Sequence, residues 1–416
     1  MCPYTGSVRV AANPARSRRR RAVRAGIVIV VLLVVVTTLY ASCFRPAGRA
    51  AMAEGNTILS ADLGGRGPGS LVGAESMPNL VSSIDDTGAQ SARISYRSSD
   101  GDTGTETVVS GTVFVPGGKP PAGGWPTVAY GHGATGIDPS CGPSSYNDLL
   151  GQSAPVVELL ERGYAVAFPD YQGLGAEGIH PFTDARTAGL NMIDAVRALR
   201  ATFPGVSKRW AAYGGSLGGG AAWAANEQAA AYAPELEFVG SVAVSPAADV
   251  TGVVAKAADG ELTLEQAGVL QWLLVSLNRL HAEVNLDDFR RGTASASWQS
   301  LSACAFSADR SDALDALNPD DLGPHTPAAA AQLRELLQRW ALPQRPLSGP
   351  LSVVYGDNDA YLDHEWTTQA VQRACASGGM VNSRLESGKG HLDVDASDQA
   401  QWLEDRFAGK AVSRDC

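Results

Sequence analysis

The hydrophobic pattern of the chain changes its period near residue 126. Before that point, residues 92–97 and 107–115 alternate between apolar and polar positions around a turn rich in glycine and aspartate, which predicts a β-hairpin. After it, short apolar runs alternate with segments of helical periodicity, which predicts a doubly wound, mostly parallel sheet. The apolar runs expected to form strands are 126–130, 164–168, 209–213, 237–244 and 351–355, followed by a short one near 380–386.

Helical segments fill the intervals between these strands. We expect helices at about 146–162, 184–203, 217–232, 364–377 and 396–408. One interval is far longer, because about 100 residues from 248 to 349 have helical periodicity and no convincing strand. An insertion of that size between two sheet strands predicts a helical lid. The expected fold is therefore α/β, with functional residues in loops at the carboxyl ends of the strands.

The N-terminal segment has the features of an export signal. Residues 1–43 contain seven arginines and neither an acid nor a lysine, and residues 25–44 are uncharged and largely apolar. Residues 1–44 are thus expected to direct the chain outside the cytoplasmic membrane, either as a cleaved signal or as a retained anchor, with Cys43 a candidate for lipidation. Residues 45–75 are expected to be a flexible linker to a domain spanning 76–416.

The charge of the remaining chain excludes one class of partner. The whole sequence has 33 basic and 43 acidic residues, and without the seven N-terminal arginines the net charge falls from −10 to −17. Such an acidic body does not attract nucleic acid. A separate expectation is that the protein is a monomer. Export also gives meaning to the cysteines, since four in the body imply two disulfides among three possible pairings. No Cys/His cluster has metal-site spacing, so no metal or cofactor is expected.

A serine stands where a nucleophile would be needed. The segment Gly214-Gly215-Ser216-Leu217-Gly218 follows the expected strand 209–213 and begins a helix. A nucleophilic serine projects from such a tight strand-to-helix turn, where glycines let neighbouring chains approach closely. No lysine follows the glycines, which disfavours a phosphate-binding loop. Ser216 is therefore the expected nucleophile.

A serine nucleophile needs a base and a carboxylate that orients the base, in the order Ser, Asp/Glu, His for this fold. Asp359 follows the strand 351–355 and His391 follows the last short strand, so both occupy strand-end loops in that order. Asp357 is the competing carboxylate and His180 the competing base. We expect the losing carboxylate to cap a turn or face solvent.

A glycine-rich loop supplies a candidate oxyanion hole. After the strand 126–130 the chain reads Gly131-His132-Gly133-Ala134-Thr135-Gly136. Acyl transfer develops negative charge on a carbonyl oxygen, which two convergent N–H groups stabilise. We assign these donors to the backbones of Ala134 and Leu217, with Gly133 as the nearest substitute for Ala134.

These motifs resemble those of the microbial secretory lipase family of α/β-hydrolases, from about residue 90 to the end. The resemblance is also carried by the segment Pro169-Asp170-Tyr171-Gln172-Gly173-Leu174-Gly175 and by the helix that follows at 184–197. It implies the disulfides Cys141–Cys304 and Cys375–Cys416, whose loops could each contribute about 3–5 kcal/mol. Gly215 and Leu217 depart from the family's usual aromatic and glutamine, which leaves the acyl chain-length preference open.

The expected function is that of an exported serine carboxylic ester hydrolase, a lipase or esterase acting on acyl esters or lipids. Three alternatives use the same fold: an exported serine peptidase, an acyltransferase, and a binding protein without catalysis. The expected location is secreted or attached to the cell envelope, with membrane association through residues 25–44 or a lipidated Cys43.

Overall fold

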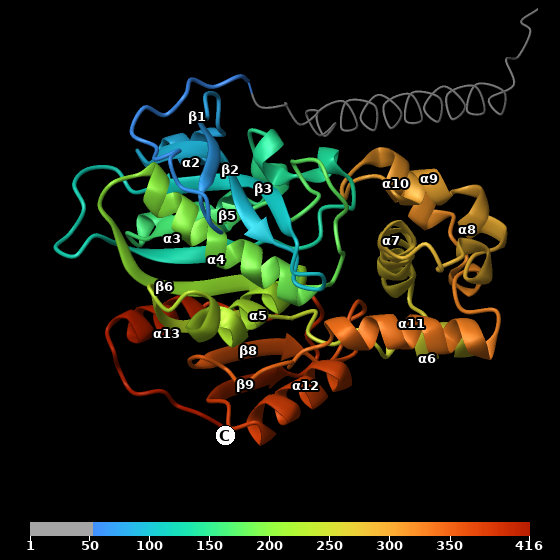
Figure 1. Ribbon diagram of the computed structural model, residues 1–416. Helices are drawn as coiled ribbons and strands as arrows, with labels where there is room; N and C mark the ends of the chain where they lie inside the picture. Colours follow the sequence, from blue (N-terminus) through green and yellow to red (C-terminus); the bar gives the residue numbers. More distant parts are fainter. Residues whose placement is uncertain (1–52) are drawn as a thin grey trace, which may run out of the picture. The chain divides into compact units, whose positions relative to one another are not determined.

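The chain forms one nine-stranded sheet, in a computed structural model that describes residues 53–416 (Figure 1). The strand order is β1-β2-β3-β5-β4-β6-β7-β8-β9. The strands are β1 (Leu71–Ser76), β2 (Gln90–Ser99), β3 (Glu106–Val115), β4 (Trp125–Gly131), β5 (Ala165–Pro169), β6 (Val206–Gly215), β7 (Glu237–Val244), β8 (Leu351–Gly356) and β9 (Val381–Glu386). Strands β5 to β9 and β4 pair in parallel, whereas β1, β2 and β3 add an antiparallel extension. The predicted α/β fold class is confirmed.

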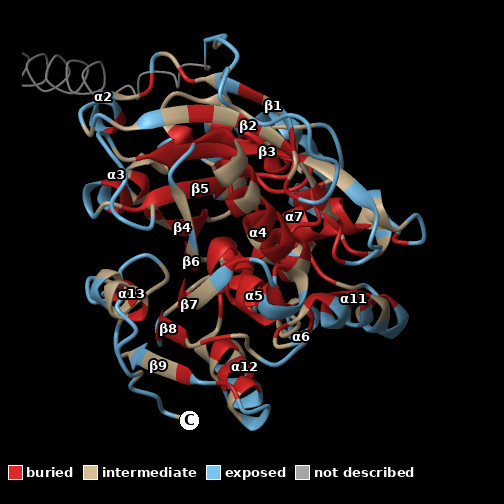
Figure 2. Cartoon of the chain, turned by 60° about the vertical axis from the view of Figure 1, so that its left-hand side comes forward, coloured by how far each residue is buried: buried red, intermediate tan, exposed pale blue. Residues whose placement is uncertain are grey.

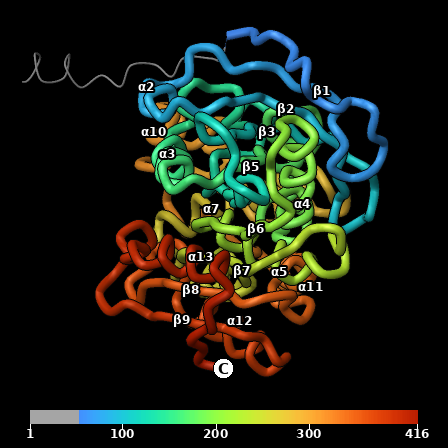
Figure 3. The backbone as a smooth tube through the Cα atoms, turned by 90° about the vertical axis from the view of Figure 1, so that its left-hand side faces the viewer, coloured from blue at the N-terminus to red at the C-terminus, as the bar shows by residue number. Residues whose placement is uncertain are grey.

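Helices cover both faces of the sheet. Helices α4, α5 and α12 pack on one face, and α3 and α13 pack on the other. The helices outside the long insertion are α2 (Ser82–Asp85), α3 (Ser153–Glu161), α4 (Ala185–Thr202), α5 (Leu217–Tyr232), α12 (His364–Ala376) and α13 (Gln399–Phe407). Short 3-10 helices occur at Pro139–Cys141, Pro143–Ser145 and Leu149–Gly151. Figure 2 shows that α4 and α5 are buried along much of their length, and Figure 3 shows β1 and β9 at opposite ends of the sheet.

The chain between β7 and β8, which we call the insert (residues 248–349), is built from helices. They are α6 (Val253–Asp259), α7 (Leu264–Leu280), α8 (Gly292–Ala296), α9 (Trp298–Leu301), α10 (Ala308–Asp315) and α11 (Pro327–Trp340), with 3-10 helices at Leu286–Asp288 and Pro319–Asp321. These helices gather beside one end of the sheet (Figure 1). The apolar residues of α7 and α11 belong to the same buried cluster as those of α4 and α5, so the insert shares the main core.

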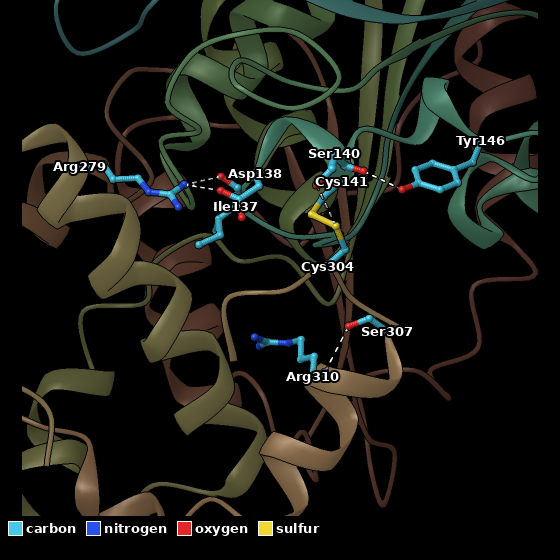
Figure 4. Close-up of a disulfide and its surroundings, with 9 residues drawn as sticks. All are labelled: Ile137, Asp138, Ser140, Cys141, Tyr146, Arg279, Cys304, Ser307 and Arg310. Carbon is cyan, nitrogen blue, oxygen red and sulfur yellow. Dashed lines mark hydrogen bonds and ion pairs between the residues drawn. A yellow bond between two sulfur atoms is a disulfide. The ribbon is translucent and has the colours of Figure 1, made fainter. Parts of the chain in front are cut away.

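Two disulfides tie distant segments together. Cys141, in the loop after β4, bonds to Cys304 of the insert (Figure 4). Cys375 of α12 bonds to Cys416. Both pairings implied by the resemblance are therefore confirmed. The first bond joins residues 163 positions apart, so it strongly restricts the unfolded chain.

The expected linker at 45–75 differs from the structure in its second half. Strand β1 starts at Leu71 and pairs with β2, and Thr57 forms an isolated bridge with Glu75. The reason is burial, because Leu71 and Ala74 of this glycine- and serine-rich segment lie in the core. The domain thus begins before residue 76. The predicted signal at 1–44, including Cys43, lies outside the described residues, and within 53–416 no helix has the length and hydrophobicity needed to cross a membrane.

A buried carboxyl joins the helix after β6 to the chain that leads into β8. Glu227 Oε2 accepts the backbone N–H groups of Gln344 and Arg345, each at 3.0 Å. Burial raises the pKa of Glu227 from 4.5 to about 7. The folded chain therefore holds this proton more tightly than the unfolded chain. Its stabilising contribution is complete below about pH 4.5 and is lost as the pH rises through about 7.

We expect Glu227→Gln to stabilise the fold at alkaline pH, because the amide stays neutral while an acceptor oxygen remains. The free energy of unfolding should rise by about 1–3 kcal/mol at pH 8 and change much less at pH 5. Urea unfolding at the two pH values measures this. The matched control is Glu161→Gln, which changes an exposed carboxyl. Equal effects of Glu227→Gln at both pH values would contradict the expectation.

Candidate active site

Every candidate residue lies at the carboxyl end of a parallel strand. Ser216 follows β6, the glycine-rich loop with Ala134 follows β4, Asp359 follows β8 and His391 follows β9. Parallel strands bring these loops to one edge of the sheet, where α/β proteins bind ligands. The sheet thus gathers residues that are up to 257 positions apart in the sequence.

Ser216 has a strained backbone that is held in place by the neighbouring strand. Its φ and ψ are 56° and −121°, in a region of backbone conformation that residues other than glycine rarely adopt. Its N–H donates to Val244 O at 2.9 Å, and its carbonyl accepts the N–H of Ala247 at 3.0 Å. This is the geometry of a nucleophile elbow, in which the side chain projects from a tight turn between strand and helix.

Glycines on either side let the elbow pack against the end of β4. A Cβ on Gly214 would lie 2.2 Å from Gly218 O, and a Cβ on Gly218 would lie 2.0 Å from Gly131 O. Both contacts are with backbone, which cannot move aside without distorting the sheet. Gly215 is different, since its added Cβ would meet only Val244 O at 3.9 Å.

These two neighbouring glycines provide a matched test of the elbow. We expect Gly214→Ala to displace the turn, so that it lowers both the reactivity of Ser216 and the thermal midpoint sharply. We expect Gly215→Ala to fold like the wild type, because the new methyl group is in ordinary contact. Thermal unfolding and activity of the two variants, measured in parallel, check the prediction. Equal stability of the two variants would contradict the clash at Gly214.

Asp359 and His391 are in direct contact. His391 Nδ1 and Asp359 Oδ2 are 2.6 Å apart, and both side chains are almost fully buried. The other carboxylate oxygen, Oδ1, accepts the N–H groups of Tyr361 and Leu362 at 2.8 and 3.0 Å. The carboxylate is therefore fixed from three directions. It holds Nδ1 as the donor, which leaves Nε2 as the nitrogen able to accept a proton.

The structure separates the two competing carboxylates and the two competing histidines. Asp357 is exposed and accepts hydrogen bonds from Gly388 N at 2.5 Å and Ser387 Oγ at 3.0 Å, so it caps the turn after β9. His180 is buried in the loop that connects β5 to α4, and its Nδ1 lies 2.9 Å from Gln172 O. Burial lowers the pKa of His180 to about 4. Of the two aspartates, only Asp359 bonds to His391.

Strand β7 connects Ser216 to the histidine loop. Val244 accepts the N–H of Ser216, and the hydroxyl of the next residue, Ser245, donates to His391 O at 3.1 Å. The ring of Tyr361 packs on the ring of His391 at 4.8 Å. Sequence reasoning missed Ser245 and Tyr361, because neither belongs to a motif and both act only through tertiary contacts.

The glycine-rich loop after β4 lies against the elbow. A Cβ on Gly133 would be 3.8 Å from Ser216 Cβ, and His132 Nδ1 is 2.6 Å from Gly133 O. Leu217 is the first residue of α5, where backbone N–H groups lack helical partners. Within residues 53–416, no hydrogen bond occupies the N–H of Ala134 or that of Leu217. Both N–H groups are thus without a protein acceptor in this part of the chain.

No group of three or more His, Cys, Asp or Glu residues in the described part of the chain could hold a metal ion. The candidate residues are of the types that acyl transfer uses: a serine in a strand-to-helix turn, a histidine bonded to a carboxylate, and backbone N–H groups.

The fold is that of the α/β-hydrolases, as comparison with solved structures shows. Lipase A of Candida antarctica, in its closed state, superposes with a TM-score of 0.68 at 16% identity, over 88% of this chain and 86% of that one. A hydrolase from Legionella pneumophila reaches 0.67 at 18% identity, over 82% and 100% of the two chains. The ligand-bound rice cell wall degrading esterase of Xanthomonas oryzae reaches 0.64 at 20% identity, over 82% and 97%.

Sequence comparison shows a more specific similarity, to the secretory lipases. The secretory lipase family model matches residues 151–305, which contain Ser216 and the first half of the insert. Lipase 10 of Candida albicans is 37% identical over 114 residues, which are 25% of this chain and 23% of that protein. The matched part thus spans about a quarter of this curated relative's length. The resemblance to the secretory lipases, stated above from the motifs, is confirmed.

Proposed function

We propose that the protein is an exported serine carboxylic ester hydrolase of the lipase or esterase type. The observation that carries this proposal is the Asp359–His391 contact at 2.6 Å, beside an elbow that presents Ser216 with a positive φ. In this proposal, His391 Nε2 takes the proton of the Ser216 hydroxyl as its oxygen attacks an ester carbonyl. Asp359 keeps the imidazole in the required tautomer and stabilises the imidazolium that forms.

The carbonyl oxygen becomes negatively charged in the tetrahedral intermediate. The N–H groups of Ala134 and Leu217 donate to it, which lowers the barrier without any proton transfer. The alcohol leaves with the proton from His391, and the acyl group remains on Ser216. Water then attacks this ester in the same way and releases the acid. The mechanism uses no cofactor.

The insert is proposed to act as a lid over the acyl-binding side of the site. It contacts both catalytic loops, because Thr263 Oγ1 donates to Ala360 O at 2.6 Å and Ala305 N donates to Thr135 O at 2.8 Å. Thr263 also caps α7, so the start of that helix and the loop carrying Asp359 are held together. The two disulfides support a location outside the cytoplasm, either secreted or attached to the cell envelope.

Two measurements test the proposed function. A fluorophosphonate should label the protein on the peptide that contains Ser216, as identified by mass spectrometry. p-Nitrophenyl esters of increasing acyl length should be hydrolysed, whereas amino-acid anilides should not. Faster cleavage of anilides would favour the peptidase alternative, and formation of a new ester with an added alcohol in place of free acid would favour an acyltransferase. The absence of any labelling would remove the hydrolase assignment.

A further inference from the structure

The insert contains a buried arginine that has no counterion within residues 53–416. Arg310, in the first turn of α10, is only 6% exposed, and its guanidinium carbon lies 3.5 Å from the centroid of the Trp272 ring. Its Nη2 donates to Gly268 O at 3.0 Å, and its Nη1 lies 3.4 Å from Gln271 Oε1. Both acceptors are neutral. Among the described residues, no carboxylate lies within ion-pair distance of Arg310, and no hydrogen bond uses its Nε.

An unpaired buried charge is costly, and among the described arginines only Arg406 is in a similar position, with Trp402 O and Ala411 O as its acceptors. Neutral oxygens can accept hydrogen bonds from the N–H groups of a guanidinium, but they offset only part of the cost of burying its positive charge. Two exposed or half-buried arginines of the insert have acidic partners: Arg279 pairs with Asp138 at 2.8 Å and Arg290 with Asp287 at 3.2 Å. Burial lowers the pKa of Arg310 to about 9, which still leaves it charged at neutral pH. A cation retained at this position needs an explanation.

Neighbouring residues relate Arg310 to the candidate site. Ala305, five residues earlier, bonds to Thr135, the neighbour of Ala134 in the glycine-rich loop. On the other side, burial, Glu265 and Asp359 raise the pKa of Tyr361 while Arg310 opposes the rise, so Tyr361 is within electrostatic range of Arg310. The ring of Tyr361 packs on His391. In Figure 4, the Arg310 side chain extends from the start of α10 toward α7, the helix that carries Arg279.

A second buried donor lies next to the guanidinium. Trp272 is 5% exposed, and its indole Nε1 has no hydrogen-bond partner among the described residues. The hydroxyl of Thr135 is also buried, and it has no hydrogen-bond partner within residues 53–416. An unpaired N–H beside an uncompensated cation is the arrangement that a carboxylate would complete, because both groups would then gain an anionic acceptor.

We propose that Arg310 and Trp272 form a subsite for a carboxylate group of the ester substrate. The substrate class is then anionic esters, such as monoesters of dicarboxylic acids, rather than simple neutral lipids. This inference rests on the proposed esterase function, and it names a specificity residue of that same site. The carboxylate could belong to the acyl part or to the alcohol part of the ester, and the experiment has an arm for each.

The experiment compares kcat/KM for matched anionic and neutral esters. The acyl arm uses p-nitrophenyl hydrogen adipate against p-nitrophenyl methyl adipate, and the alcohol arm uses 4-acetoxybenzoate against its methyl ester. In one arm, Arg310→Gln should lower the anionic-to-neutral ratio by about tenfold or more. Arg310→Lys should retain most of the ratio. Trp272→Phe replaces the indole with a smaller aromatic ring that has no N–H, and it should lower the ratio less than Arg310→Gln does.

Arg279→Gln is the matched control, because it removes an insert arginine that already has a carboxylate partner. It should leave the ratio unchanged. An unchanged ratio with Arg310→Gln in both arms would overturn the subsite, since a merely structural arginine would lower both activities equally. If Arg310→Gln does not fold, an unchanged ratio with Trp272→Phe overturns the proposal instead.

A binding measurement separates failure of the subsite from failure of the esterase function. Calorimetry should show monomethyl adipate binding to the wild type and at least about tenfold weaker binding to Arg310→Gln. A wild type that hydrolyses neutral esters but does not bind monomethyl adipate would overturn the subsite alone. A wild type that binds it but hydrolyses no ester would overturn the proposed function and leave the subsite supported.

Discussion

Ser216→Ala should abolish ester hydrolysis while leaving the protein folded. Removal of the nucleophile in a serine hydrolase lowers kcat by about 10⁶-fold, and what remains comes from the oxyanion donors and substrate binding. The fold should survive, because the contacts that hold this residue use its backbone N–H and carbonyl rather than its hydroxyl. Hydrolysis of a p-nitrophenyl ester, together with circular dichroism, measures both effects.

The control for this variant is Ser207→Ala, at the opposite end of β6. It should retain the activity of the wild type, because Ser207 is far along the strand from the carboxyl-end loops. A Ser216→Ala protein that is folded and still hydrolyses the ester would contradict the assignment of the nucleophile.

Asp359→Asn should lower kcat by about 10⁴-fold with little loss of substrate binding. The asparagine amide can donate to His391 Nδ1, which would force the proton onto Nε2 and prevent that nitrogen from accepting the serine proton. The Tyr361 and Leu362 N–H groups can still bond to the amide oxygen, so the loop should keep its shape. Kinetics across pH 5–9, with kcat and KM determined separately, measure the change.

Asp357→Asn provides the comparison two residues away. Its carboxylate bonds only to the turn after β9 in the described structure, so the variant should keep kcat within a few-fold of the wild type. If Asp357→Asn were the more damaging of the two substitutions, the choice of carboxylate would be wrong. The pair therefore tests the distinction that separates the two aspartates in the structure.

Some parts of the fold could be read from local pattern, and others could not. The strands around the site are short apolar runs bounded by turns, so their positions and those of the strand-end loops are largely local properties. Strand β1 was missed, because its sequence is rich in small and polar residues and only pairing with β2 reveals it. In the sheet, β5 lies between β3 and β4, although it follows β4 in the sequence, and no local sequence pattern indicates this order.

The sequence by itself determined the fold class, the order of the candidate catalytic residues and the serine on its elbow. These features depend on periodicity and on glycines a few residues apart, which act locally. Only the tertiary structure decided which aspartate meets His391, because the two are equally well placed along the chain. It also decided that Arg310 has no counterion among residues 53–416, although three acids, Asp309, Asp312 and Asp315, lie in its own helix. Both outcomes depend on side-chain directions set by packing between segments distant in sequence.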